Sequence, residues 1–124
     1  MHHDRAQNWQ SAEQRHGWAT CPITENGFVR ILSQPRYRNS VTTAVAIATL
    51  QRSIASSDHA FWSDDVSMTD SAVFDHTHNL GPKLITDLYL LALAARHGGR
   101  LVSSDRTIPA AAVRIAKPEH LVVL

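Results

Sequence analysis

The stretch from Leu84 to Asp105 constrains the fold more than any other part of this 124-residue chain. Its first part, LITDLYLLALAARHGG, joins helix formers to a pair of glycines, which predicts a helix over 85–97 that stops at Gly98. Apolar residues cover nearly all sides of that helix, so we expect it to be deeply buried. The following RLVS predicts a short strand, and Asp105 comes just after it. A buried helix followed by a short apolar strand is typical of an α/β domain.

Short apolar strands alternate with helices along the rest of the chain. Thr24, Ser40 or Thr42, and Thr69 are the expected N-caps. We expect helices at 3–16, 24–32, 42–56, 69–75 and 85–97 and strands at 18–21, 59–62, 100–103 and 121–124. This alternation favours a short parallel sheet with helices on both faces, which is a three-layer α/β/α sandwich. No interior linker divides the chain, so we expect one domain over residues 1–124.

Composition and charge limit the classes of function. The chain has 12 Lys and Arg against 11 Asp and Glu, and a net charge of +1 neither demands nor excludes a nucleic acid. Cys21 is the single cysteine, so an intrachain disulfide is impossible and we expect a reducing, cytoplasmic location. No apolar run approaches the roughly 20 residues that a membrane-spanning helix needs, so we expect no membrane partner.

Three acidic residues lie near the ends of predicted elements. Asp105 follows a strand, Asp87 opens the helix at 85–97, and Glu25 follows the strand at 18–21 by a few residues. Sites in open parallel sheets form beyond the carboxyl ends of the strands, so the three acids could meet at one edge. Clustered carboxylates favour Mg²⁺ or Mn²⁺. The alternative is structural, because acids are common in first helical turns and aspartate is common in turns.

Three segments carry a resemblance to a known family. ITDLYLLALAARHGGRLVSSDRTI resembles the C-terminal half of a PIN-domain ribonuclease of the VapC toxin type, in which a T/S-D-A-x-L-L-A-L-A helix precedes G-G-x-L-x-T-x-D. ATCPITENGFVRILSQPRY resembles the segment that holds the family's second acid, and PEHLVVL resembles its closing strand. The resemblance implies a PIN fold and a metal-dependent endoribonuclease toxin of a toxin–antitoxin pair, which hydrolyses RNA phosphodiesters with metal-activated water.

The resemblance also implies roles for individual residues. Glu25, Asp87 and Asp105 match three acids of the family's four-acid catalytic site, so they are the expected ligands of Mg²⁺ or Mn²⁺. Ser103 matches a Thr or Ser that lies beside the metal. Arg30, on the helix of the first acid, and Arg36, in the basic loop after it, are candidate phosphate contacts. For both arginines the alternative is a solvated surface.

The family's first acid has no counterpart in this sequence, because no D-x-N/S-x-L segment precedes the first predicted helix. We therefore expect a PIN-like sheet without its first strand, weaker metal binding, and a sheet edge that a second chain or an antitoxin segment could cover. The implied partners are RNA such as a tRNA loop, a VapB-type antitoxin, and a second copy of the chain in a homodimer. The alternative function is a catalytically inactive PIN module that acts by binding the antitoxin or another chain.

Overall fold

The computed structural model describes residues 17–56, 58–78 and 81–124. The described residues fall into two compact units, 17–64 and 65–124, here called the N-terminal unit and the C-terminal unit. The helix expected over 3–16 lies outside the described residues.

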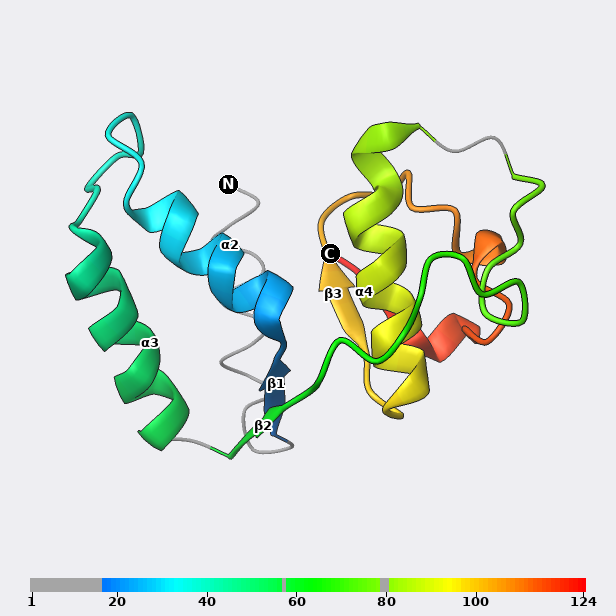
Figure 1. Ribbon diagram of the computed structural model, residues 1–124, viewed down its shortest axis with the longest axis horizontal. Coiled ribbons are helices and arrows are strands. Elements are labelled where there is room, and N and C mark those ends of the chain that lie inside the picture. Colours follow the sequence, from blue (N-terminus) through cyan, green and yellow to red (C-terminus); the bar gives the residue numbers. More distant parts are fainter. Residues whose placement is uncertain (1–16, 57, 79–80) are drawn as a thin grey trace. The chain divides into compact units, whose positions relative to one another are not determined.

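The N-terminal unit is a helical hairpin that links two parallel strands (Figure 1). Strands β1 and β2 pair in parallel, and helices α2 and α3 between them pack against each other. Parallel strands need a long crossover, which the two helices supply. The elements in chain order are β1 (Trp18–Thr20), α2 (Pro22–Leu32), α3 (Thr43–Ser56) and β2 (His59–Phe61). The structure thus confirms both expected strands and the helix expected over 42–56, and Thr42 accepts a hydrogen bond from the Val45 N–H as an N-cap does.

The start of α2 differs from the prediction. Cys21 is the N-cap, and Pro22 occupies the first turn, where its missing N–H would have no helical partner in any case. The expected N-cap, Thr24, is instead the third helical residue. Its hydroxyl accepts a hydrogen bond from the Cys21 N–H (2.9 Å) and donates to the Cys21 carbonyl (3.0 Å). Thr24 therefore holds the helix start from inside the first turn, and this turn also contains Glu25.

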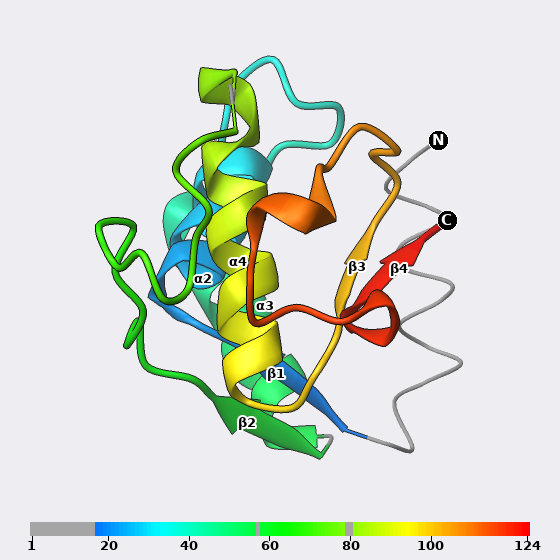
Figure 2. The same cartoon turned by 90° about the vertical axis from the view of Figure 1, so that its right-hand side faces the viewer.

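The C-terminal unit is built around helix α4. Strands β3 and β4 pair in parallel, and α4 contacts β3 and the short helices that lead to β4 (Figure 2). Three of its elements are single turns of 3-10 helix. The elements are η2 (Pro82–Leu84), α4 (Ile85–Arg96), β3 (Leu101–Ser103), η3 (Ala110–Ala112), η4 (Pro118–His120) and β4 (Leu121–Val123). The structure confirms the helix and both strands expected here, so the chain belongs to the α/β class.

Helix α4 forms the core of the C-terminal unit, as its apolar composition predicted. Burial extends to successive residues, so several sides of the helix are covered by protein. The buried residues of α4 are Leu88, Tyr89, Leu91, Ala92, Leu93 and Ala94. Further buried residues of the same unit are Val66, Val73, Phe74, Ile108, Ala112 and Val113. None of the described helices has the length and apolar content to cross a lipid bilayer.

The short helix expected over 69–75 is wrong, because this segment forms turns. The Asp70 side chain accepts a hydrogen bond from the Ala72 N–H at 2.9 Å, which competes with helical hydrogen bonding. Phe74 then forms a bridge with Val113, and the Arg114 N–H donates to the Val73 carbonyl at 2.7 Å. Pairing with a distant segment thus replaces the local helix.

Candidate metal-binding carboxylates

Asp87 is a half-buried carboxylate in the first turn of α4. Burial, and after it the negative charge of Asp105, raises the pKa of Asp87 above its ordinary value. Both causes disfavour the charged form of the carboxylate. The charge of Asp105 acts on Asp87, so the two carboxylates share one electrostatic environment. No described residue donates a hydrogen bond to the Asp87 carboxylate.

Asp105 follows β3, and its carboxylate is oriented by a tight turn. Its Oδ1 atom accepts hydrogen bonds from the N–H (2.8 Å) and the hydroxyl (2.5 Å) of Thr107. Its own N–H donates to the Ser103 hydroxyl at 3.0 Å, and the Ser103 carbonyl accepts from the Leu124 N–H at 2.9 Å. Asp105 is therefore both a turn residue and a neighbour of Asp87, so the two interpretations of the sequence are compatible. Ser103 holds this turn at the end of the β3–β4 pair through that hydrogen bond, and its predicted place beside a metal stays a prediction.

Two neighbouring carboxylates of this kind suit a divalent cation. Their mutual repulsion is relieved when a proton or a cation lies between them. Mg²⁺ is commonly bound by one or two carboxylates and keeps several waters, so a pair of aspartates fits it. In the described part of each unit, no group of three or more His, Cys, Asp or Glu side chains gathers at metal-binding distances. Of the three predicted ligands, Asp87 and Asp105 interact electrostatically within the C-terminal unit, and their role as ligands stays a prediction.

Glu25, the third predicted ligand, belongs to the N-terminal unit and has a defined local environment. Its Oε2 atom accepts a hydrogen bond of 2.6 Å from the hydroxyl of Thr20, which is the last residue of β1. The same hydroxyl lies 2.8 Å from Nε2 of His59 on β2. Sequence reasoning did not single out Thr20 or His59. A contact across 39 residues depends on the strand register, and no local pattern encodes it.

Comparison with known proteins decides the family. Ribonuclease VapC44 of Mycobacterium tuberculosis (strain ATCC 25618 / H37Rv) is 47% identical over 122 residues, which are 98% of this chain and 86% of VapC44. Ribonuclease VapC39 of the same strain is 42% identical over 109 residues, 87% of this chain and 78% of VapC39. The chain belongs to the VapC family of toxin–antitoxin ribonucleases. This confirms the family resemblance found in the sequence.

A third VapC relative agrees with this assignment, whereas comparisons with family models and with solved structures found no match. Ribonuclease VapC38 of the same strain is 40% identical over 109 residues, 85% of this chain and 73% of VapC38. No family model matches the chain, and no solved structure matches it. The VapC assignment thus rests on relatives that match 85% or more of this chain.

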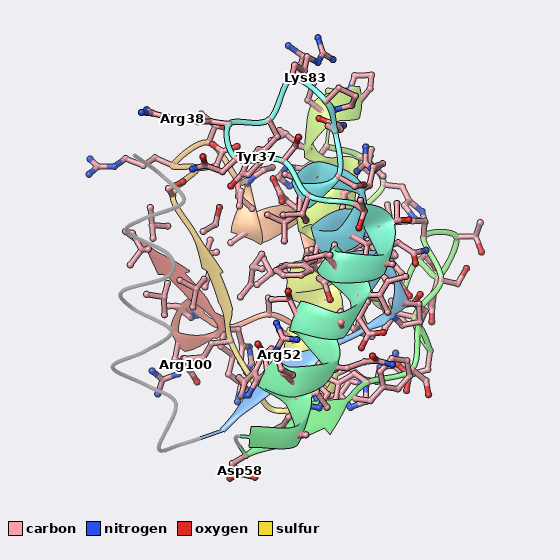
Figure 3. All side chains as sticks on the ribbon, turned by 90° about the vertical axis from the view of Figure 1, so that its left-hand side faces the viewer. Tyr37, Arg38, Arg52, Asp58, Lys83 and Arg100 are labelled. Atoms are coloured by element: carbon pink, nitrogen blue, oxygen red, sulfur yellow. The ribbon has the colours of Figure 1, made fainter. Side chains whose placement is uncertain are left out.

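The arginines predicted to contact RNA lie on the α2–α3 hairpin of this VapC chain. Arg30 is in the last turn of α2, and Arg36 is in the loop that follows; both side chains are exposed. Figure 3 shows Tyr37 and Arg38 in the same loop. Asn39 adopts the left-handed backbone conformation there (φ 64°), which asparagine tolerates better than most residues. The exposure leaves both predicted interpretations of these arginines open.

Proposed function

We propose that this chain, as a VapC ribonuclease, hydrolyses RNA phosphodiesters with a divalent metal held by Asp87 and Asp105. Family membership supports the ribonuclease part, because the relatives that cover most of the chain carry that name. The electrostatic interaction between Asp87 and Asp105 supports the metal part of the proposal. A half-buried carboxylate whose neighbour is also a carboxylate is poised to accept a cation.

The proposed ligands are Asp87, Asp105 and Glu25, with Mg²⁺ or Mn²⁺ as the ion. When bound, such an ion activates a water and neutralises charge on the phosphodiester. Asp87 offers a half-buried carboxylate from the first turn of α4, and Thr107 holds the orientation of Asp105. For Glu25 the support is its place in the family-like segment TENGFVR, in the first turn of α2. Ser103 keeps the turn of Asp105 in place.

We propose that both units belong to one PIN-type domain, a three-layer α/β/α sandwich over residues 1–124. The support is the parallel pairing in each unit, β1 with β2 and β3 with β4, together with the match to VapC44 across 98% of the chain. A three-layer arrangement requires parallel strands joined by helical crossovers, and the N-terminal unit has such a crossover.

The proposed partners follow from the family. RNA such as a tRNA loop is the substrate, and Arg30 and Arg36 contribute positive charge to bind its phosphates. A VapB-type antitoxin is the proposed inhibitor, and a second copy of the chain completes a homodimer in the cytoplasm. A phosphate contact requires accessible side chains, and both arginines are exposed.

Cleavage of RNA with Mn²⁺ by the wild type and by Asp87→Asn and Asp105→Asn tests the proposal. We expect cleavage by the wild type and strong loss in both variants, because each lacks one charged ligand. Asp64→Asn, which alters an exposed loop carboxylate, is the control and should cleave normally. Equal rates for the wild type and Asp87→Asn would overturn the metal assignment. A folded wild type that binds RNA without cleaving it would favour the catalytically inactive binding module instead.

A further inference from the structure

Thr20 is a buried polar residue that joins two charged or titratable side chains. Its side chain lies at the end of β1, and the residue is 8% exposed. Its hydroxyl contacts Glu25 Oε2 at 2.6 Å and His59 Nε2 at 2.8 Å. Both distances are within the range of strong hydrogen bonds. The three side chains therefore form one hydrogen-bonded chain.

The number of available protons decides which group donates each of these two hydrogen bonds. A threonine hydroxyl has one proton to donate, and an ionised carboxylate can only accept. Thr20 therefore donates to Glu25, and it must accept from His59. His59 then carries a proton on Nε2, either as the neutral Nε2–H tautomer or as the imidazolium ion.

The strand pairing holds the histidine in place. In the parallel register of β1 and β2, His59 lies opposite Trp18, and the two ring centroids are 4.7 Å apart in an edge-on arrangement at 64°. The Trp62 N–H donates to the Thr20 carbonyl at 2.8 Å, which fixes the backbone beside the hydroxyl. The donor and the bridging hydroxyl are thus positioned by the sheet, and Glu25 is positioned by α2.

Capping of helix α2 does not explain the hydrogen bonds that join Glu25, Thr20 and His59. Thr24 already satisfies the Cys21 N–H at the start of this helix. The Glu25 carboxylate instead turns to the buried hydroxyl of Thr20. A carboxylate that is held through one oxygen presents the other in a fixed direction, and such bonds to a metal ligand set the orientation of the ligand.

We propose that His59 and Thr20 are positioning residues for Glu25: the His59–Thr20 hydrogen-bond chain holds Oε2 and orients the carboxylate toward a divalent cation. This inference rests on the proposed role of Glu25 as a ligand. His59 and Thr20 touch neither the cation nor the RNA. They act on metal affinity and turnover through Glu25 alone.

Matched variants separate the hydrogen bond from the packing. His59→Phe keeps a ring against Trp18 but removes the donor, whereas His59→Gln keeps a donor and loses the ring. Thr20→Val keeps the shape without the hydroxyl, and Thr20→Ser keeps the hydroxyl. We expect His59→Phe and Thr20→Val to bind Mn²⁺ about 10- to 100-fold more weakly, with His59→Gln and Thr20→Ser closer to the wild type. The Mn²⁺ affinity is measured without RNA, by electron paramagnetic resonance of the free ion.

The double variant tests whether both residues act through one chain. Thr20→Val with His59→Phe should lose no more Mn²⁺ affinity than the worse single variant, because either change already breaks the chain. The turnover number kcat should fall with KM for RNA unchanged. Thermal melting identifies variants that fail to fold. Additive losses, or unchanged Mn²⁺ affinity in folded Thr20→Val, would overturn the proposal.

Two further measurements separate this inference from the proposed function. Glu25→Gln should weaken Mn²⁺ binding at least as much as Thr20→Val. If Glu25→Gln binds Mn²⁺ normally, the proposed ligand role fails; if Glu25→Gln is impaired but the folded His59 and Thr20 variants are not, only the positioning role fails. Nitrogen NMR of the metal-free protein should show His59 with a proton on Nε2. A neutral Nδ1–H tautomer would contradict the hydrogen-bond chain.

Discussion

The carboxylate of Asp87, at the start of α4, lies close enough to Asp105, just after β3, for the charge of Asp105 to raise the pKa of Asp87. Burial of Asp87 acts in the same direction and is the larger cause. Without a cation, the folded protein therefore holds a carboxylate in a position where its charge is unfavourable. These two negative groups therefore lower the folding stability of the metal-free protein at the site where the proposed metal would bind. Such a loss of stability is common at functional sites.

Asp87→Asn should stabilise the metal-free protein at neutral pH. Because the pKa of Asp87 is raised by folding, the folded state binds this proton more tightly than the unfolded state does. Stability is therefore lost as the pH rises through the folded pKa. The gain of the variant should be modest, since solvent reaches Asp87, and it should shrink as the pH falls toward the ordinary aspartate value of about 3.9. Thermal melting in EDTA at several pH values measures this, with Asp64→Asn as the control.

Addition of Mn²⁺ should make the wild type more stable than Asp87→Asn, which is the opposite of the order expected without metal. A ligand that binds only the folded state stabilises it by about 2.7 kcal/mol at a concentration 100 times its dissociation constant. The wild type should therefore melt at a higher temperature when Mn²⁺ is added, while Asp87→Asn and Asp105→Asn should gain little. Calorimetric melting curves with and without Mn²⁺ give the comparison. An equal gain in the wild type and in both variants would place the ion elsewhere.

Arg36→Ala should weaken RNA binding without affecting the metal. Each phosphate contact on a single strand adds roughly 0.7 to the slope of log affinity against log salt, so the variant should lose about that amount. Arg52→Ala is the control, because Arg52 is an exposed arginine of α3 that hydrogen-bonds to Thr49 within its own helix (Figure 3). RNA affinities at several salt concentrations, measured in an Asp87→Asn background to prevent cleavage, test this. An unchanged slope would show that Arg36 is a solvated residue.

The features that the sequence predicted best are local. Helix α4 was predicted from leucine and alanine on nearly all sides, and its burial follows from that composition. The short strands were predicted from apolar runs between turn residues. Asp87 and Asp105 could be predicted as a pair of ligands because their motif is contiguous over 22 residues, and that ligand role stays a prediction.

The features that the sequence missed depend on contacts between distant segments. The sequence of 69–75 predicts a helix, but the segment forms turns and Phe74 pairs with Val113. No local pattern in the sequence reveals that pairing. His59 approaches Thr20 because two strands pair in one parallel register, and a shift by one residue would place His59 on the opposite face. The helix start at Cys21 was misjudged because threonine is favoured as an N-cap but also serves as the third helical residue, where Thr24 bonds back to the Cys21 N–H and carbonyl.

Leu91→Ala should strongly destabilise the protein. Leu91 is fully buried in the middle of α4 (0% exposed), and large-to-small changes at such positions leave a cavity and cost about 2–5 kcal/mol. Ile85→Ala is the matched control, because Ile85 is on the same helix but is 37% exposed and should cost much less. Urea unfolding measures both free energies. Similar losses in the two variants would contradict the view that α4 is the core of the C-terminal unit.

Asp75→Asn should change the acid sensitivity of the C-terminal unit. Hydrogen bonds from the side chain and the backbone N–H of Thr77, together with Arg114, lower the pKa of Asp75. A lowered pKa means that the stabilisation is fully present above the ordinary aspartate value and is lost as the pH falls through the folded pKa. The variant should therefore unfold less steeply with decreasing pH below about pH 4. The Asp75 N–H also donates to the Ala112 carbonyl at 2.8 Å, and asparagine retains that bond. Acid titration followed by circular dichroism tests this, and identical curves for variant and wild type would show that the Asp75 charge contributes nothing to the attachment of this loop.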